Sequence, residues 1–173
     1  MNDQPFFQLS MNPMESEHKP DGTPSAPGSI MRFKKILVAV DFSAPARKAL
    51  YIASAMGADT GAQLVLVHVW QPHVPALGEP PLAAPVGDIE HEVERALSDW
   101  EHEAKQTGAR LVTTQALVGV PWEELIALLR ADPSFDLVVM GTHGRTGLKH
   151  VMLGSVAETV VRHAPCAVLV VRE

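Results

Sequence analysis

The sequence predicts an α/β protein with an open, doubly wound parallel sheet of five strands, covered by four helices. Two observations carry this prediction. Short apolar runs rich in β-branched residues, as expected of strands buried on both faces, recur along the chain. Segments with apolar residues at helical spacing separate them. Strands that alternate with helices in this way need right-handed crossovers and a parallel sheet.

The first strand, the first helix and the second strand are expected to follow one another directly. "KKILVAV" at 34–40 contains a continuous apolar run that is typical of a buried strand. The next segment offers Ser43 as an N-terminal cap, Pro45 in the first helical turn and Gly57 as a stop. "AQLVLVHVW" at 62–70 repeats the buried-strand pattern and gives the second strand.

A proline-rich loop comes next, at 71–87, and is a candidate for a lid or a partner surface. From Ile89 to Ala104 apolar residues recur at helical spacing, which predicts a long amphipathic helix. "ARLVTTQALV" at 109–118 gives the third strand. Pro121 then marks the first turn of the third helix.

The last part of the chain continues the alternation. "FDLVVM" at 135–140 is expected as the fourth strand, and "CAVLVV" at 166–171 as the fifth. Between them a helix is expected from about Ser155 to His163. The predicted order is therefore βαβαβαβαβ.

Composition and charge exclude several classes of function. The net charge is -6 and the basic residues are scattered, so nucleic acid is not expected as a partner. Apolar segments such as 36–40 are far shorter than the roughly 20 residues that cross a bilayer. The start "MNDQPFFQLS" lacks the features of a secretory signal. Cys166, the single cysteine, is expected as a buried thiol, and a cytoplasmic location fits.

The first thirty residues differ from the rest of the chain. Residues 1–30 are rich in proline and have no apolar period, so they are expected to form a disordered tail. Residues 31–173 are expected to form one domain. Met31 also leaves open a later start of translation, directly before the first strand.

The stretch "MGTHGRTGLKHVMLGS" at 140–155 gathers four of the chain's 12 glycines after a strand. Ligands of doubly wound sheets lie outside the carboxyl ends of the strands. Gly141 and Gly144 can take positive φ and let the backbone approach a ligand. Ser155 and Glu158 have the spacing of a capping box, so a helix N-terminus, which attracts anions, should face the same space. A phosphate site is one interpretation, and glycines that only serve tight turns are the other.

This stretch resembles the ATP-binding branch of the universal stress protein family. It matches the pattern G-x2-G-x9-G-[ST] with Gly141, Gly144, Gly154 and Ser155. The similarity also includes "KKILVAVDFS", "LVHVW" and "HAPCAVLVV", and it spans about residues 32–172. At Ala167 the chain departs from the proline of many relatives. The resemblance implies a Rossmann-like sheet of the adenine nucleotide alpha hydrolase type, with strand order 3-2-1-4-5.

The resemblance also implies a set of nucleotide-binding residues. Asp41 would contact the nucleoside, although helix capping together with Ser43 is an alternative. Gly141 would lie against ribose, and the Gly144 amide would meet phosphate. The remaining candidates would form the apolar walls around adenine, screen charge or bind phosphate at the helix start: Val40, Val69, Met140, Arg145, Gly154, Ser155 and Val156.

The ligand implied is ATP, with or without Mg²⁺ or Mn²⁺ held through phosphate oxygens and water. No catalytic residue and no protein metal site can be assigned, and His68 is expected as a hydrogen-bonded strand histidine. Whether the protein is an enzyme stays open, with at most slow ATP hydrolysis expected.

Two functions of different classes follow. The first is a nucleotide-responsive stress-response module, and the alternative is a nucleotide-independent dimeric interaction protein of the same fold. Adenylyl transfer ranks last, because its signatures are missing. Strand five would leave an apolar edge, so a homodimer through about residues 167–171 is expected, unless the tail shields that edge.

Overall fold

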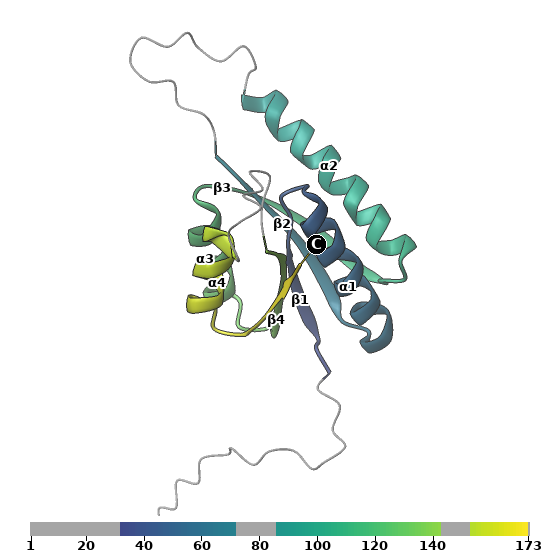
Figure 1. Cartoon of the computed structure of the whole chain (residues 1–173). Helices are drawn as coiled ribbons and strands as arrows, with labels where there is room; N and C mark the ends of the chain where they lie inside the picture. The colour runs from purple at the N-terminus through teal and green to yellow at the C-terminus, as the bar shows by residue number, and fades with distance from the viewer. Residues whose placement is uncertain (1–31, 72–85, 143–152, 173) are drawn as a thin grey trace, which may run out of the picture. The chain divides into compact units, whose positions relative to one another are not determined.

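Nine elements alternate along the chain in the computed structural model, which describes residues 32–71, 86–142 and 153–172 (Figure 1). The predicted tail at 1–30 and most of the proline-rich loop lie outside these residues. The elements are β1 (Lys35–Ala39), α1 (Ala44–Thr60), β2 (Gln63–Trp70), α2 (Val86–Gln106), β3 (Leu111–Val118), α3 (Pro121–Ala131), β4 (Leu137–Gly141), α4 (Ser155–His163) and β5 (Ala167–Val171).

The five strands form one parallel sheet in the order β3-β2-β1-β4-β5. The predicted fold class and strand order are therefore confirmed. β1 lies in the centre, where Ala39 pairs with Val67 of β2 and with Met140 of β4. The strand order reverses at β1, so the carboxyl ends of β1, β2 and β4 meet at one edge of the sheet, where ligands of such folds bind.

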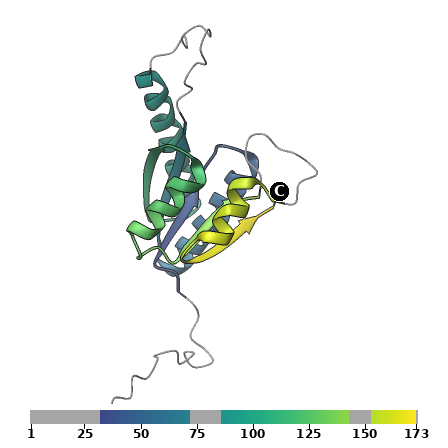
Figure 2. The same ribbon diagram turned by 90° about the vertical axis from the view of Figure 1, so that its left-hand side faces the viewer.

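The helices cover the two faces of the sheet in pairs. α1 and α2 lie on one face and α3 and α4 on the other, as two views at right angles show (Figures 1 and 2). Successive β1 residues point to opposite faces: Ile36 and Val38 join the core beneath α1 and α2, whereas Leu37 joins the core beneath α3 and α4. All three are fully buried. Burial on both faces explains why the strands read as unbroken apolar runs.

Helix α1 begins as predicted but ends later. The Ala46 amide donates to the Ser43 hydroxyl at 3.3 Å, so Ser43 is the N-terminal cap. The prediction that Gly57 stops the helix is wrong. Gly61, with φ 77°, ends it, and its amide donates to the Gly57 carbonyl at 2.9 Å. A Cβ on Gly57 would lie 2.5 Å from Leu64 Cδ1, so close packing on β2 accounts for this glycine.

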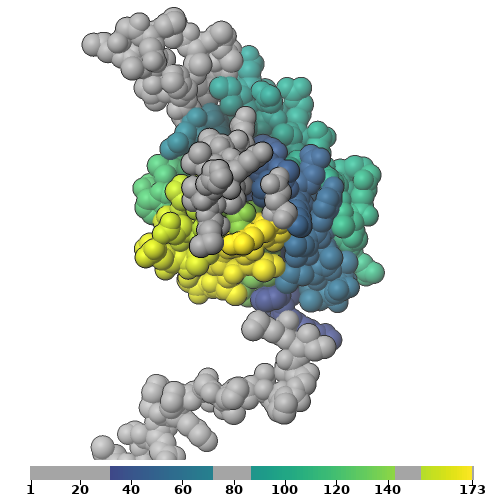
Figure 3. All heavy atoms as spheres, in the orientation of Figure 1, coloured from purple at the N-terminus to yellow at the C-terminus, as the bar shows by residue number. Residues whose placement is uncertain are grey.

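Two edges of the sheet lie at the surface, β3 on one side and β5 on the other. Leu111 of β3 and Leu169 of β5 are exposed by 59% and 36%. The yellow C-terminal segment that contains β5 faces the viewer in Figure 3. Within the ranges that the structure describes, none of the helices combines the length and the apolarity that crossing a bilayer requires.

Candidate functional site

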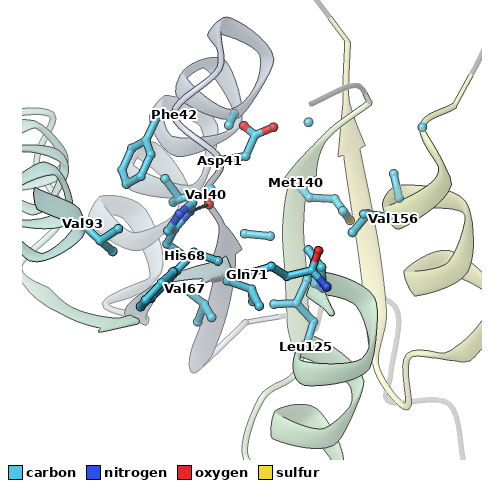
Figure 4. Close-up of a pocket in the computed structure, with 18 of the residues that line it drawn as sticks. Val40, Asp41, Phe42, Val67, His68, Gln71, Val93, Leu125, Met140 and Val156 are labelled. Atoms are coloured by element: carbon cyan, nitrogen blue, oxygen red, sulfur yellow. Dashed lines mark hydrogen bonds between the residues drawn. The ribbon is translucent and has the colours of Figure 1, made fainter. Parts of the chain in front are cut away.

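A cavity of about 910 Å³ opens where the carboxyl ends of β1, β2 and β4 meet (Figure 4). Residues of all three strands line it, together with residues from the first turns of α3 and α4 and from one side of α2. Its size lies within the range of pockets that hold small-molecule ligands and cofactors. The cavity therefore lies where ligands bind in folds of this topology.

Most residues predicted from the sequence for nucleotide binding come together around this cavity. Eight of the ten predicted residues line it: Val40, Asp41, Val69, Met140, Gly141, Gly154, Ser155 and Val156. The other two, Gly144 and Arg145, lie outside the described residues. The sequence positions span more than a hundred residues, and the parallel sheet brings them to one edge.

Sequence reasoning missed the wall of the cavity on the α2 side. Part of this wall belongs to α2. Apolar spacing predicted that one side of this helix is buried, but it could not predict that this side faces a cavity. The rest follows Asp41 or ends β2. The residues on this side are Phe42, His68, Trp70, Ile89, Glu92, Val93 and Ala96, and Gln71 is a further lining residue that was not predicted. The Gln71 side chain extends toward Leu125 of α3 (Figure 4). Alternation along β2 could have placed His68 and Trp70 on one face.

Asp41 is part of the turn that starts α1. Its Oδ1 accepts hydrogen bonds from the Ser43 amide at 3.0 Å and from the Ser43 hydroxyl at 2.5 Å. The Ser43 hydroxyl in turn accepts from the Ala46 amide. Ser43 is therefore the cap of α1, Asp41 holds Ser43 in place, and Asp41 also lines the cavity. Oδ1 is committed to the turn, whereas Oδ2 accepts no hydrogen bond from the described part of the chain.

His68 lies buried beside this turn, with 7% of its surface exposed. Its Nδ1 lies 2.6 Å from the Val40 carbonyl oxygen. Because a carbonyl only accepts, Nδ1 must carry the proton and donate it. The expectation of a hydrogen-bonded strand histidine is confirmed. This bond joins β2 to the end of β1, next to Asp41.

The structural reason for a glycine at Gly141 is close packing, not the positive φ that was expected. Gly141 does not have the positive φ that the glycine pattern suggested. A Cβ at this position would lie 2.9 Å from the Pro45 carbonyl carbon and 3.0 Å from the Ala46 amide nitrogen. The backbone of α1 therefore packs directly on the end of β4. This close approach brings the start of α1 and the end of β4 together at the cavity.

The N-terminus of α4 faces the cavity, but the capping box predicted for it is wrong. Gly154, with φ -69°, is the N-terminal cap, and Ser155 is the first helical residue. Glu158 is therefore the fourth helical residue, whereas a capping box needs a glutamate at the third. Its carboxylate instead pairs with Arg162 at 2.7 Å. The Gly154 amide donates to the Thr142 carbonyl at 2.7 Å, which ties the helix start to the end of β4.

Within the described residues, this cap leaves the first amides of α4 without a backbone acceptor. In any α-helix the first amides have no intrahelical acceptor. Ser155, Val156 and Ala157 supply these amides here, and all three residues line the cavity. The positive end of the helix dipole also lies at this point. The arrangement suits an anionic group better than a neutral one.

Comparison with known proteins gives the chain its family. A model of the universal stress protein family matches residues 32–172. A universal stress protein of Thermus aquaticus is 35% identical over 140 residues, which cover 81% of this chain and 99% of the relative. The solved structure of universal stress protein UspA from Lactobacillus plantarum is 28% identical, with a TM-score of 0.71 over 82% of this chain and 99% of that one.

A further solved structure carries a nucleotide. The universal stress protein from Archaeoglobus fulgidus, in complex with dAMP, has a TM-score of 0.59 and is 24% identical, over 82% of this chain and 99% of that one. This likeness shows the shared fold. Since the family model spans the whole predicted domain and the Thermus relative matches over nearly its full length, the chain belongs to the universal stress protein family.

Proposed function

We propose that this protein binds ATP in the cavity at the carboxyl ends of β1, β2 and β4, and acts as a nucleotide-responsive stress-response module. One observation carries the proposal: an apolar wall, a carboxylate and a helix N-terminus line a single cavity. These three features match, in chemistry, the base, the ribose and the phosphates of a nucleotide.

The apolar part of the cavity suits the adenine base. Val40 and Met140 are buried and Val69 is half-buried, and they come from three neighbouring strands. Leu125 of α3 lies opposite, as Figure 4 shows. Flat aromatic ligands gain most of their binding free energy from burial between apolar surfaces of this kind.

The polar part suits ribose and phosphate. Asp41 Oδ2, which accepts no hydrogen bond from the described residues, is the proposed acceptor for a ribose hydroxyl, and the amides of Ser155 and Val156 are donors for phosphate oxygens. The match to G-x2-G-x9-G-[ST] supports ATP as the nucleotide, with Gly144 and Arg145 as further phosphate contacts. The dAMP complex of the Archaeoglobus relative supports an adenine nucleotide in the same fold.

A divalent cation, Mg²⁺ or Mn²⁺, would accompany the triphosphate mainly through phosphate oxygens and water. Asp41 and Ser155 are the oxygen-bearing side chains closest to that role. Hydrolysis is proposed to be slow at most. Asp41 Oδ1 and His68 Nδ1 are both engaged by hydrogen bonds at the β1–α1 turn, which supports a binding role for these residues.

The proposal extends to location and assembly. The protein would act in the cytoplasm as a homodimer, in which the β5 edges of two copies meet. The exposed Leu169 supports this arrangement, as does the position of β5 at the edge of the sheet that the described residues form, because open apolar edges invite pairing.

Isothermal titration with ATP tests the binding proposal, with and without Mg²⁺. We expect saturable binding of ATP and much weaker binding of GTP. Asp41→Asn should weaken ATP binding about tenfold, as expected for loss of a hydrogen bond to a charged group. Gly144→Val should lower affinity without changing the unfolding temperature. Absence of ATP binding by the wild-type protein would overturn the proposal and favour the nucleotide-independent alternative.

A further inference from the structure

Phe42 has an unusual backbone conformation next to the proposed binding residue Asp41. Its φ is 64°, and it is the single non-glycine residue with positive φ in the ranges 32–71, 86–142 and 153–172. A bulky side chain in this left-handed region is sterically strained. Such strain persists only where the surrounding structure enforces it, and it concentrates at functional sites.

The ring of Phe42 is held by two aromatic neighbours from different elements. Its centroid lies 4.5 Å from that of His68 on β2 and 5.6 Å from that of Trp100 on α2, which it meets edge to face. Both geometries lie within the favourable range for aromatic pairs. His68 is itself fixed by its hydrogen bond to Val40, and Trp100 is buried. We call Phe42, His68 and Trp100 the aromatic brace.

The strained conformation determines where the Asp41 carboxylate lies. Phe42 points toward α2, whereas the Asp41 carboxylate lies on the side of the cavity where Met140 and Val156 are found (Figure 4). The chain reversal at Phe42 brings the Ser43 amide and hydroxyl back to Asp41 Oδ1. The carboxylate is thus held in one orientation before any ligand arrives.

We propose that Phe42, held by the aromatic brace, is a positioning residue for nucleotide binding. This inference rests on the proposed function, since it assigns Phe42 a role through Asp41. Preorganisation raises affinity because the ligand does not have to order the carboxylate when it binds. Contacts within the aromatic brace offset the cost of the left-handed backbone. The strained turn therefore persists, and it fixes the position of the Asp41 carboxylate.

A double-mutant cycle between Phe42→Gly and Asp41→Asn tests this role, with ATP affinity measured by calorimetry. Glycine adopts the same backbone conformation without strain but removes the ring. We expect Phe42→Gly to weaken ATP binding about fivefold in the wild-type background and hardly at all in the Asp41→Asn background. A residue that only supports the fold would instead weaken binding equally in both backgrounds.

Matched variants separate this role from general loss of packing. Phe33 packs as a partly buried ring against the same core cluster but does not line the cavity. Phe33→Gly should therefore leave ATP affinity unchanged, while Phe42→Tyr, which keeps the ring, should retain affinity. If Phe42→Gly does not fold, as judged by circular dichroism, Phe42→Leu replaces it in the cycle.

The outcomes of the cycle are distinct. Equal losses in both backgrounds, or no loss on Phe42→Gly, would overturn the role of Phe42 and leave the proposed function standing. Failure of the wild-type protein to bind ATP would overturn the proposed function, and the role of Phe42 with it.

Discussion

Packing between α1 and β4 leaves no room for a side chain at Gly141. A larger residue at this position is therefore predicted to lower the free energy of unfolding. Gly141→Ala would place a Cβ 2.9 Å from the backbone of Pro45, and backbone atoms cannot move aside as a flexible side chain can. We expect a loss of about 1–3 kcal/mol in the free energy of unfolding, the usual cost of overpacking. Urea denaturation measures this loss.

Gly87 provides the matched control. It is the second residue of α2, it has no positive φ, and a Cβ placed on it would meet no heavy atom of the described chain within 4 Å beyond its chain neighbours and the local helix backbone. Gly87→Ala should stabilise the protein by about 0.5–1 kcal/mol, because alanine loses less backbone entropy than glycine in a helix. If both substitutions changed stability in the same direction, packing would not explain Gly141.

Asp132 lies at the opposite end of the sheet from the cavity. Its hydrogen bond with Lys35 is expected to make the stability of the protein depend on pH. Its hydrogen bond from Lys35 Nζ, at 2.6 Å, is the main cause that lowers the pKa of Asp132 to about 2, and Ser134 adds to it. A carboxyl group whose pKa is depressed on folding stabilises the protein above its unfolded pKa, near 4, and this contribution is lost as the pH falls toward 2.

Asp132→Asn should therefore lower the urea midpoint at about pH 6, and this difference from wild type should shrink below about pH 4. Asp99→Asn is the control, because Asp99 is exposed on α2 and has no hydrogen bond or ion pair in the described ranges. A difference between Asp132→Asn and wild type that stays constant down to pH 2 would contradict the pairing with Lys35.

At the level of the helix, Ser43 and Ser155 form a natural pair for comparison. Ser43 caps α1 through its side chain, whereas Ser155 is the first helical residue of α4 and makes no side-chain cap hydrogen bond. Ser43→Ala should cost about 1 kcal/mol in unfolding free energy, and Ser155→Ala should change it by less than about 0.5 kcal/mol. Thermal unfolding of both variants measures this difference, and a destabilising Ser155→Ala would show that Ser155 has a capping role.

The elements themselves could be predicted from the sequence more reliably than their ends. The apolar runs of strands buried on both faces, the helical spacing from Ile89 to Ala104 and the start signals at Ser43 and Pro121 predicted the elements and their order. The helix from Ser155 to His163 was predicted with the bounds that α4 has, but the end of α1 at Gly57 and the capping role of Ser155 were predicted wrongly. In both cases a residue with the right local chemistry lies one turn or one position from the true cap, because packing of the helix on the sheet decides where it starts or stops.

The candidate site was likewise predictable only in part. A spacing motif and resemblance identified Asp41 and Ser155, because both lie at strand or helix ends that the topology brings together. Phe42 and His68 carried no such signal. The position of Phe42 depends on a left-handed backbone and on Trp100, far away in the sequence, and neither property can be seen in a single sequence.

For the whole molecule, the two open edges of the sheet give opposite predictions. The proposed homodimer uses β5, and the other edge, β3, also exposes an apolar side chain. A lysine in an edge strand blocks pairing with another chain, because its charge would have to be buried against the partner. Leu169→Lys, on β5, should therefore convert the dimer to a monomer, as measured by light scattering coupled to size exclusion.

Leu111→Lys, on β3, makes the same chemical change at the more exposed edge and should leave the dimer intact. Both leucines are exposed, so neither substitution should lower the unfolding free energy of the isolated domain by more than about 0.5 kcal/mol. A dimer that persists in Leu169→Lys and dissociates in Leu111→Lys would move the interface to β3. A wild-type monomer at micromolar concentration would remove the interface altogether, and the β5 edge would then have to be protected within a single chain.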